Sequence, residues 1–446
     1  MKKGLVFVFA AIFCFAIAMA GCSSGTPDGS GQADTPSAPP TPSGNAGQAA
    51  ADSISLRIMT SGTIDPENDF ITEALPALIS QHWPNIAVEA TKLPDDQYYT
   101  AITTQLAAGS APDIFMVFPK MSSSASVYDL GGAGYLLDMS GLGFWGNISE
   151  GVASDMSFEG KKYAVADGMD MLGVYYNKDM FDSNGLSIPQ SWDEYLNACE
   201  TLKNAGILPI VAADQDLWWV QFGMYQVAAN MVYPQNPNFD TDLQTGATSF
   251  SDAPWVDTIS RYAELYDNGY VNSTSLSTSE AQAYQMFIDG QAAMLFCGTW
   301  AYNSLVADGA AQFERGLFAM PANDSGGPVV SAATSSGYAI NANTAYPEEC
   351  KAVFEWWFEE GSELFDAWCE SNTSISSYIG VETPYGLYEY ILGQYNSNGA
   401  YYFCNQMWPS GVADEMEVKF VELVGGQGVT AQDVADAMQA KYDELN

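Results

Sequence analysis

The sequence predicts an α/β fold built on a parallel sheet, and the order of its first apolar segments indicates this most clearly. Residues 54–59 alternate apolar and polar side chains, which is typical of a strand. Residues 86–90 and 114–118 are two further short runs rich in aliphatic side chains. Stretches with helical spacing, at residues 68–82 and 98–108, lie between these runs. Strand, helix, strand, helix, strand is the order of a parallel sheet.

The loops that follow the first and third predicted strands are the first candidates for a binding site. In parallel α/β sheets, ligands bind beyond the carboxyl ends of the strands. The loops are residues 60–65 and 118–121, and the second predicted helix is expected to end at Gly109. The polar side chains in these loops that we expect to contact ligand are Ser61, Thr63, Asp65 and Lys120.

Composition limits what the protein can bind. The chain has 446 residues, of which 47% are apolar and 13% aromatic, enough to bury a sizeable core. It carries 14 Lys and Arg against 54 Asp and Glu, a formal net charge of −40. This charge excludes nucleic acid as an expected partner and disfavours anionic ligands. With one histidine, His82, imidazole catalysis and His-rich metal sites are not expected, and we predict no cofactor and no metal.

The first 52 residues predict a targeting signal and a flexible linker. Residues 1–21 begin with lysines and continue with a 16-residue apolar stretch, shorter than the ~20 residues of a membrane span. Ala20 and Gly21 precede Cys22 and resemble a bacterial lipobox, which implies a signal peptide cleaved before Cys22 and a lipid on its sulfur. The alternative is an ordinary secretory signal. Of residues 23–52, 24 are Gly, Ser, Pro, Ala or Thr, so 22–52 is expected to be lipid anchor and linker.

The cysteines do not predict a disulfide framework. Of the seven, Cys14 lies in the predicted signal and Cys22 is the predicted lipid site, which leaves five. Their number is odd and their spacings are wide, so we expect most of them to be buried as small apolar side chains. A single disulfide among them is an alternative that the sequence leaves undecided. The five are Cys199, Cys297, Cys350, Cys369 and Cys404.

Residues 347–369 have the spacing of a single helix with an apolar face. The run Glu355-Trp356-Trp357-Phe358 is rich in aromatic side chains, which suggests ligand stacking at first sight. Because these residues lie within the predicted helix, packing in the core is the favoured interpretation.

Several segments in order along the chain resemble one family, the extracellular solute-binding proteins of the sugar-binding class (family 1). These proteins serve ATP-binding cassette (ABC) importers. The segments begin with residues 95–114, which contain Leu106-Ala107-Ala108-Gly109 and Ala111-Pro112-Asp113-Ile114. The others are Val174-Tyr175-Tyr176-Asn177, Ser191-Trp192-Asp193-Glu194-Tyr195 and Phe287-Ile288-Asp289-Gly290 with Gly298-Thr299-Trp300.

The resemblance implies a two-lobed fold like that of type II periplasmic binding proteins, with a hinge between the lobes. Residues 53–165 and about 336–385 are expected in lobe 1, and residues 166–335 and about 386–446 in lobe 2. The chain is expected to cross between the lobes near residues 164–170 and 335–339. Gly168 and Gly337 lie there and are interpreted as sources of backbone freedom.

The ligand is predicted to be a carbohydrate, because the resemblance places aromatic and acidic side chains where sugars bind in the family. Sugars present flat apolar faces and a rim of hydroxyls, which aromatic rings and carboxylates recognise. Trp300 follows a predicted strand, and one of Trp218 and Trp219 is expected to face the ligand. Trp408 and Asp170 complete the predicted set. The alternatives left open are a core position for Trp300 and a turn-capping role for Asp170.

Two classes of function remain at this stage. The favoured class is a lipid-anchored receptor on the outer face of the cell membrane, expected to be a monomer. It is expected to capture an oligosaccharide and deliver it to an ABC transporter's permease subunits, with no chemical reaction. The alternatives are the same fold binding a non-sugar solute, and a cell-surface glycoside hydrolase, which needs two carboxylates flanking the bond. The 54 acidic residues make such a pair impossible to select from sequence.

Overall fold

The computed structural model describes residues 53–62, 69–306, 312–324, 326–383 and 385–446. These residues belong to one compact unit of the chain. In this part of the chain, no helix combines the length and the apolar character needed to cross a membrane. The predicted signal peptide, Cys22 and linker lie outside the described residues, as do Thr63 and Asp65.

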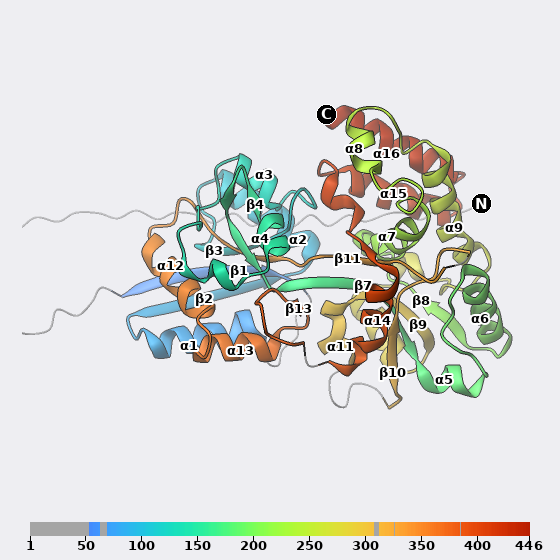
Figure 1. Cartoon of the computed structure of the whole chain (residues 1–446), viewed down its shortest axis with the longest axis horizontal. Helices are drawn as coiled ribbons and strands as arrows, with labels where there is room; N and C mark the ends of the chain where they lie inside the picture. Colours follow the sequence, from blue (N-terminus) through green and yellow to red (C-terminus); the bar gives the residue numbers. More distant parts are fainter. Residues whose placement is uncertain (1–52, 63–68, 307–311, 325, 384) are drawn as a thin grey trace, which may run out of the picture. The chain divides into compact units, whose positions relative to one another are not determined.

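The first sheet contains the three strands predicted at the start of the folded part (Figure 1). Its order is β2-β1-β3-β12-β6. β1 is parallel to both β2 and β3, with Ile58 opposite Ala90 and Ile114, so the predicted parallel arrangement is confirmed. β12 comes from much later in the chain and is antiparallel to β3 and β6. The strands are β1 (Ile54–Ser61), β2 (Ile86–Leu93), β3 (Ile114–Val117), β6 (Ala164–Ala166) and β12 (Gly337–Ile340).

Both predicted helices between these strands are present. A π-helical turn, Phe70–Ala74, leads into α1 (Leu75–His82). α2 (Asp95–Ala107) begins three residues earlier than predicted and ends as expected before Gly109, whose φ is +68°. The further elements around this sheet are α3 (Val127–Gly132), η2 (Gly143–Asn147), α4 (Glu150–Asp155), the hairpin β4 (Ser157–Phe158) and β5 (Lys161–Lys162), α12 (Pro347–Trp357) and α13 (Glu363–Ser371).

The second sheet is organised around one long strand, β7 (Gly168–Asn177). Its main order is β14-β11-β7-β9-β8, and β10 and β13 also pair with β7. β7 is antiparallel to every strand it pairs with, whereas β8 and β9 are parallel. The other strands are β8 (Leu208–Val211), β9 (Ala292–Gly298), β10 (Arg315–Phe318), β11 (Val330–Thr334), β13 (Ile375–Ser376) and β14 (Ala400–Tyr401).

Helices cover the second sheet, and the last two, α15 and α16, pack against each other and against α9 (Figure 1). The helices are α5 (Lys178–Ser183), α6 (Trp192–Asn204), α7 (Val220–Met231), α8 (Phe239–Gln244), α9 (Ala253–Asp267), α10 (Glu280–Ile288), α11 (Tyr302–Val306), α14 (Glu389–Asn398), α15 (Val412–Val424) and α16 (Ala431–Leu445). The 3-10 turns are η3 (Leu217–Trp219), η4 (Ser275–Ser277), η5 (Thr299–Ala301), η6 (Gly386–Tyr388) and η7 (Cys404–Met407).

Each sheet has its own hydrophobic core. The first core is drawn from residues 56–166 and 338–378, and the second from residues 171–332 and 388–442. We call the parts around them the first lobe and the second lobe. Two sheets with separate cores confirm the predicted α/β class with two lobes, while the outer boundaries predicted for each lobe stay predictions.

The chain passes between the two sheets through very short connections. Asp167 alone separates β6 from β7, and Ser335 and Ser336 separate β11 from β12. These connections are hydrogen bonded to each other, since Ser335 N donates to Gly168 O at 2.9 Å. β13 pairs with the same end of β7 just before the chain continues to η6.

The interpretation of Gly168 and Gly337 as sources of backbone freedom needs correction. Neither glycine has a positive φ, and both lie in strands. A Cβ on Gly168 would lie 2.0 Å from the carbonyl oxygen of Ile375, and one on Gly337 would lie 2.2 Å from that of Val165. The glycines are therefore required because backbones approach closely where the chain changes sheets.

The single helix predicted over residues 347–369 is also wrong in part. It is divided into α12 and α13, with Gly361 at a φ of +80° between them. The expectation that its aromatic run packs in the core is confirmed, because Trp356 is 8% exposed and Trp357 1%.

Candidate functional site

Trp300 lies at the end of a central strand, as predicted from the sequence. β9 ends at Gly298 and Trp300 follows in η5. A Cβ on Gly298 would lie 2.0 Å from the Trp300 ring, so only glycine lets the indole lie over the end of this strand. The indole is partly exposed, and its centroid is 5.2 Å from that of Phe222 and 6.3 Å from that of Phe403.

Three aromatic side chains gather around Trp300. Trp218, on η3, contacts Phe222 at a centroid distance of 5.4 Å. Trp218, Trp300 and Phe403 are partly exposed, while Phe222 is 5% exposed and supports them. We call these four residues, Trp218, Phe222, Trp300 and Phe403, the aromatic platform. Partly exposed rings of this kind are suited to stack on the flat face of a sugar.

Trp218 and Trp219 face in different directions, as expected for neighbouring residues. Trp219 is fully buried and packs against Phe222 and Tyr284. Of the predicted pair, Trp218 is therefore the one that reaches the aromatic platform. The ligand contact itself stays a prediction.

Trp408 does not join the platform in this structure. It is 1% exposed. Its indole makes edge-to-face contacts with Phe250, Trp255 and Tyr225, at centroid distances of 5.0, 5.3 and 6.2 Å. Its indole Nε1 donates to Asp240 Oδ1 at 3.0 Å. A stacking role for Trp408 stays a prediction, and this packing disfavours it. Phe403, five residues earlier, is partly exposed and contacts Trp300, and the sequence analysis did not single it out.

Asp240 holds the segment that carries Phe403. Besides Trp408, the hydroxyls of Tyr401 and Tyr402 donate to its Oδ2 at 3.2 and 2.6 Å. Asp240 is 3% exposed, and burial raises the pKa of its carboxyl. This carboxylate therefore anchors residues 401–408 to α8 and positions Phe403 beside Trp300.

Asp170 is buried, and its carboxylate accepts hydrogen bonds from two other segments of the chain. Its Oδ1 accepts from Thr299 Oγ1 at 2.7 Å and from Ser374 Oγ at 2.8 Å. Burial raises the pKa of this carboxyl. Because Thr299 precedes Trp300, Asp170 fixes the turn that carries the indole, which supports the capping alternative. Ligand contact by Asp170 stays a prediction.

Two of the residues predicted in the first lobe, Ser61 and Lys120, are described by the structure. Ser61 is 8% exposed and donates to the carboxylate of Asp95. Lys120 has a φ of +49°, pairs with Asp155 at 3.1 Å, and lies over the ring of Tyr402 in the second lobe at 5.1 Å. With its charge already paired, Lys120 serves here as a link between the lobes.

Two hydrogen bonds join the same loop to the platform segment. Met121 N donates to Gln406 O at 3.3 Å, and Asn405 Nδ2 donates to Ser122 O at 3.0 Å. The loop after β3 therefore contacts the segment that carries Phe403. This places the platform beside the carboxyl end of the first sheet, where ligands bind in α/β folds.

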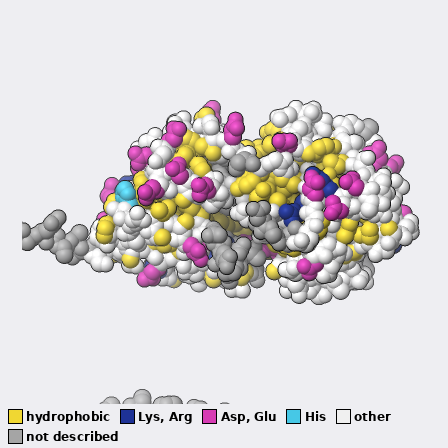
Figure 2. Space-filling view, turned by 90° about the horizontal axis from the view of Figure 1, so that it is seen from below, with side chains coloured by type: hydrophobic (Ala, Val, Ile, Leu, Met, Phe, Trp, Pro, Cys, Tyr) yellow, Lys and Arg dark blue, Asp and Glu magenta, His cyan; other side chains and the backbone are white. Residues whose placement is uncertain are grey.

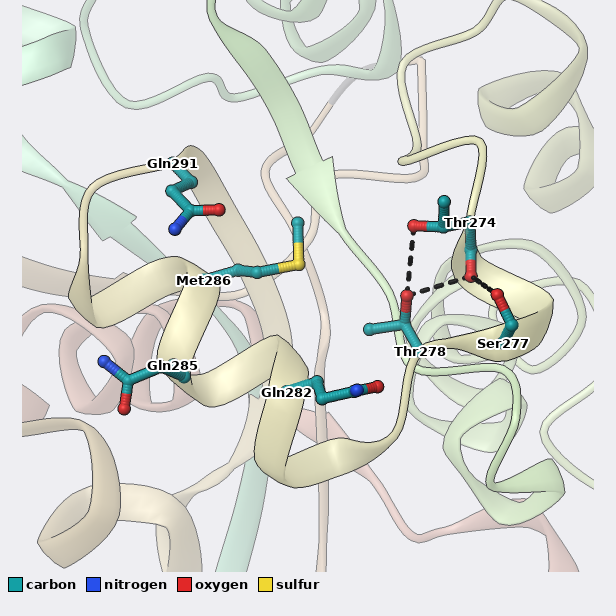
Figure 3. A pocket seen from close by; sticks show the side chains of 7 residues that line it. All are labelled: Thr274, Ser277, Thr278, Gln282, Gln285, Met286 and Gln291. Carbon is teal, nitrogen blue, oxygen red and sulfur yellow. Dashed lines mark hydrogen bonds between the residues drawn. The ribbon is translucent and has the colours of Figure 1, made fainter.

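A pocket lies elsewhere in the second lobe, away from the residues of the platform (Figure 3). It has a volume of about 460 Å³ and is formed by η4, α10 and residues next to them in the chain. Apart from Met286, its lining side chains are polar and uncharged, and none is aromatic, so the pocket offers no ring for stacking. The lining residues are Thr274, Ser277, Thr278, Gln282, Gln285, Met286 and Gln291. The aromatic platform is therefore the better candidate.

The described residues do not assemble a metal or disulfide site. No cluster of three or more metal-ligating side chains is found among them. The five cysteines are all free thiols, and Cys199, Cys297, Cys350 and Cys404 are buried.

Comparison with known proteins gives the family. Residues 71–363 match the family described as bacterial extracellular solute-binding protein. This match covers more than half of the chain, which therefore belongs to that family.

Individual relatives are more distant. The chain is 26% identical over 271 residues to the multiple sugar-binding protein of Streptococcus mutans, covering 60% of this chain and 63% of that protein. A solved chitin oligosaccharide binding protein is 24% identical, with a TM-score of 0.77, over 89% of this chain and 99% of that one. A binding protein solved in complex with raffinose is 20% identical, with a TM-score of 0.72, over 88% and 99%. The likeness to the solved structures shows a shared fold.

Proposed function

We propose that this protein is a receptor that binds an oligosaccharide at the aromatic platform and delivers it to the permease subunits of an ABC importer. The platform carries the proposal, because its three partly exposed rings, Trp218, Trp300 and Phe403, provide the apolar surface that sugar rings require. The names of relatives also support it: sugars, chitin oligosaccharide and raffinose are the ligands named for them.

Binding at this place would couple to the arrangement of the two lobes. The platform belongs to the second lobe, while Ser61 and Lys120 come from the first. A ligand that contacts both lobes stabilises the arrangement in which both sets of contacts form, by its differential affinity for that arrangement. A permease can then recognise the loaded receptor by its conformation.

The attachment to the membrane is part of the same proposal. Residues 1–21 are proposed as the signal peptide, Cys22 as the lipidated residue and residues 22–52 as the linker. Buried acyl chains contribute about 0.8 kcal/mol per methylene, so a multiply acylated cysteine holds the receptor at the outer face of the membrane. Mass spectrometry of the membrane fraction tests this, because the mature N-terminus must be a lipidated Cys22.

Isothermal titration calorimetry against a panel of mono- and oligosaccharides tests the binding function. We expect tight binding to one class of oligosaccharide, with quenching or shift of Trp fluorescence and with the sugar recovered intact. Absence of binding across the panel would leave the fold in place and refute the sugar assignment. Release of shorter sugars would show a hydrolase instead.

A further inference from the structure

The loop after β3 is joined to the second lobe at a place separate from the chain connections. Residues 120–122 belong to the first lobe and residues 402–406 to the second, and we call the contact between these two segments the interlobe contact. Met121 N donates to Gln406 O at 3.3 Å, and Asn405 Nδ2 donates to Ser122 O at 3.0 Å. Both segments are far in sequence from residues 167 and 335–336, where the chain changes sheets, so this is a second junction between the lobes.

Lys120 supplies the charge of the interlobe contact. Its Nζ lies 3.1 Å from Asp155 Oδ1 and 5.1 Å from the ring centroid of Tyr402. The other oxygen of Asp155, Oδ2, accepts from Thr334 Oγ1 on β11 at 2.6 Å. The side chains of Lys120 and Asp155 are each 21% exposed, so water and salt screen this pair less than a pair on the open surface. The ion pair belongs to the first lobe, and each of its members also contacts the second.

The backbone of Lys120 is held in a strained conformation by the first lobe. Its φ of +49° lies in the left-handed region, which residues with a side chain rarely adopt. Its N donates to Asp155 O at 3.0 Å, and its carbonyl oxygen accepts from Tyr128 N at 3.0 Å. Such a conformation persists only where the surrounding structure fixes it. The first lobe therefore positions the lysine in advance, and little ordering is needed when the second lobe comes into contact.

The second lobe's side of the contact contains polar groups that are not satisfied. The side-chain oxygens Asn405 Oδ1 and Gln406 Oε1 are enclosed and have no hydrogen-bond partner among the residues that the structure describes. Gln406 is 1% exposed, and its Nε2 donates to Thr334 O over a long distance of 3.4 Å. Enclosed acceptors without a donor destabilise the arrangement that encloses them. They offset part of the stabilisation from the ion pair, the cation–π contact and the two hydrogen bonds, so the interlobe contact is suited to form and release.

Phe403 of the aromatic platform lies within the segment that the interlobe contact holds. It stands between Tyr402 and Asn405 in the chain, and its ring centroid is 6.3 Å from that of Trp300. The contact therefore brings the first lobe against the platform. Ligands enter and leave a site between two lobes while the lobes are apart, so a contact that holds the lobes together slows entry and release alike.

Building on the proposed function, we propose that the interlobe contact is a reversible latch, with Lys120 as its positioning residue. Its bonds join residues of this chain alone, so the latch holds the lobes together with or without an oligosaccharide on the platform. Sugar enters and leaves when the latch is released. In this role Lys120 acts on the rates of binding and release through the arrangement of the lobes, rather than through contact with the sugar.

The test compares the wild type with Lys120→Met, which keeps an apolar side chain of similar length and removes the charge. Small-angle X-ray scattering without sugar should give a larger radius of gyration for the variant, because its lobes separate more often.

The rates are measured by stopped-flow Trp fluorescence, with the oligosaccharide of the calorimetric panel that binds the wild type most tightly, chitotriose and raffinose included. In Lys120→Met, the association and dissociation rate constants should both rise at least about fivefold, and Kd should stay within about twofold. The reason is that the latch stabilises the closed lobes equally with and without sugar, so its loss cancels in the affinity.

Two further variants control the experiment. Lys162→Met removes a lysine whose Nζ also lies over an aromatic ring, that of Trp145 at 4.6 Å, but within the first lobe. It should leave the radius of gyration and both rate constants unchanged. Lys120→Arg keeps the positive charge over the ring and should behave as the wild type.

A variant on the other side of the latch covers the case in which Lys120→Met does not fold. Tyr402→Leu removes the ring under the Lys120 ammonium, while Tyr401 and Trp408 still donate to Asp240. It should change the scattering and both rate constants in the same direction as Lys120→Met. Circular dichroism and melting temperatures establish that each variant is folded.

The outcomes separate this inference from the function on which it rests. Radii and rate constants equal to those of the wild type in Lys120→Met would refute the latch and leave the sugar receptor standing. Faster dissociation with unchanged association, and hence weaker affinity, would show that Lys120 contacts the sugar, which also refutes the latch. A larger radius in Lys120→Met, with no sugar of the panel bound by the wild type, would support the latch and refute the sugar assignment.

Discussion

At the scale of single residues, Trp300 owes its orientation to contacts made before any ligand binds. Thr299 is held on both sides: its Oγ1 donates to Asp170 Oδ1 at 2.7 Å, and its carbonyl oxygen accepts from Tyr388 Oη at 3.0 Å. The ring of Phe222 packs against the indole of Trp300, with a centroid distance of 5.2 Å. Such preorganisation lowers the entropic cost of binding, because the ring does not have to be ordered by the ligand.

Replacing Trp300 by Ala should weaken oligosaccharide binding by about tenfold or more, because the largest stacking surface is lost. The matched control is Trp83→Ala, which removes a partly buried indole that packs on His82 and Trp356 in the first lobe. Calorimetry on both variants measures the effect. Equal affinities for wild type and Trp300→Ala would remove Trp300 from the site.

The raised pKa of Asp167 predicts how the stability of the fold depends on pH. This residue is the whole connection between β6 and β7, and its Oδ1 accepts from Trp368 Nε1 at 2.8 Å. Burial raises its pKa from 3.8 to about 6, and the charge of Asp170 adds to this, while the Trp368 hydrogen bond opposes it. The folded state therefore holds a proton more tightly than the unfolded state. This contribution to stability is complete below pH 3.8 and is lost as the pH rises through about 6.

The Asp167→Asn variant keeps an acceptor for Trp368 but does not ionise. Relative to this variant, the wild type should lose on the order of 2 kcal/mol between pH 4 and pH 7, after discounting for partial exposure. Thermal melts of both proteins across this pH range measure the difference. Parallel curves for the two proteins would mean that Asp167 ionises as readily when folded as when unfolded.

The aromatic platform could be predicted from the sequence only in part, because some of its residues are positioned by contacts with distant segments of the chain. The apolar run before Gly298 indicates that Trp300 follows a strand, and this is local information. Whether Trp408 or Phe403 is exposed depends instead on Asp240, which binds Trp408 from 168 residues earlier in the chain.

At the scale of elements, the connections between the sheets are packed tightly. Gly168→Ala should reduce the free energy of unfolding by about 1–3 kcal/mol, because its Cβ would lie 2.0 Å from a backbone oxygen of β13 and must displace that strand. Chemical denaturation measures the loss. The control is Gly141→Ala, since no atom lies within 4 Å of a Cβ there.

This variant also distinguishes close packing from backbone freedom. If Gly168 served mainly as a flexible joint, the alanine variant would keep its stability and change ligand affinity. A loss of stability with little change in affinity per folded molecule is expected from packing.

Helices and strands could be predicted from the sequence where the pattern that identifies them lies within their own residues. β1, β2, β3 and the helices between them follow from periodicity and from Gly109 at the end of α2. The division between α12 and α13 was missed, because the apolar pattern continues through Gly361, whose positive φ breaks the helix. The pairing of β12 with β3 and β6 joins segments far apart in sequence, and periodicity alone does not determine such pairing.

At the scale of the whole molecule, uncompensated negative charge is the dominant feature. The chain carries 54 acidic against 14 basic residues, and seven ion pairs are found among the described residues. Figure 2 shows acidic side chains spread over one face, with few basic ones. Repulsion among like charges opposes the compact state, since unfolding moves the charges apart.

Sodium chloride should therefore raise the melting temperature. Screening acts over a Debye length of about 10 Å at 0.1 M and about 3 Å at 1 M, so most of the rise should occur below about 0.2 M. A general salting-out effect would instead continue to increase over the whole range. Differential scanning calorimetry at a series of salt concentrations separates the two. A melting temperature that is constant or falls between 0.01 and 0.2 M would show that the acidic surface does not limit stability, and that the acidic residues are far enough apart for water alone to screen them.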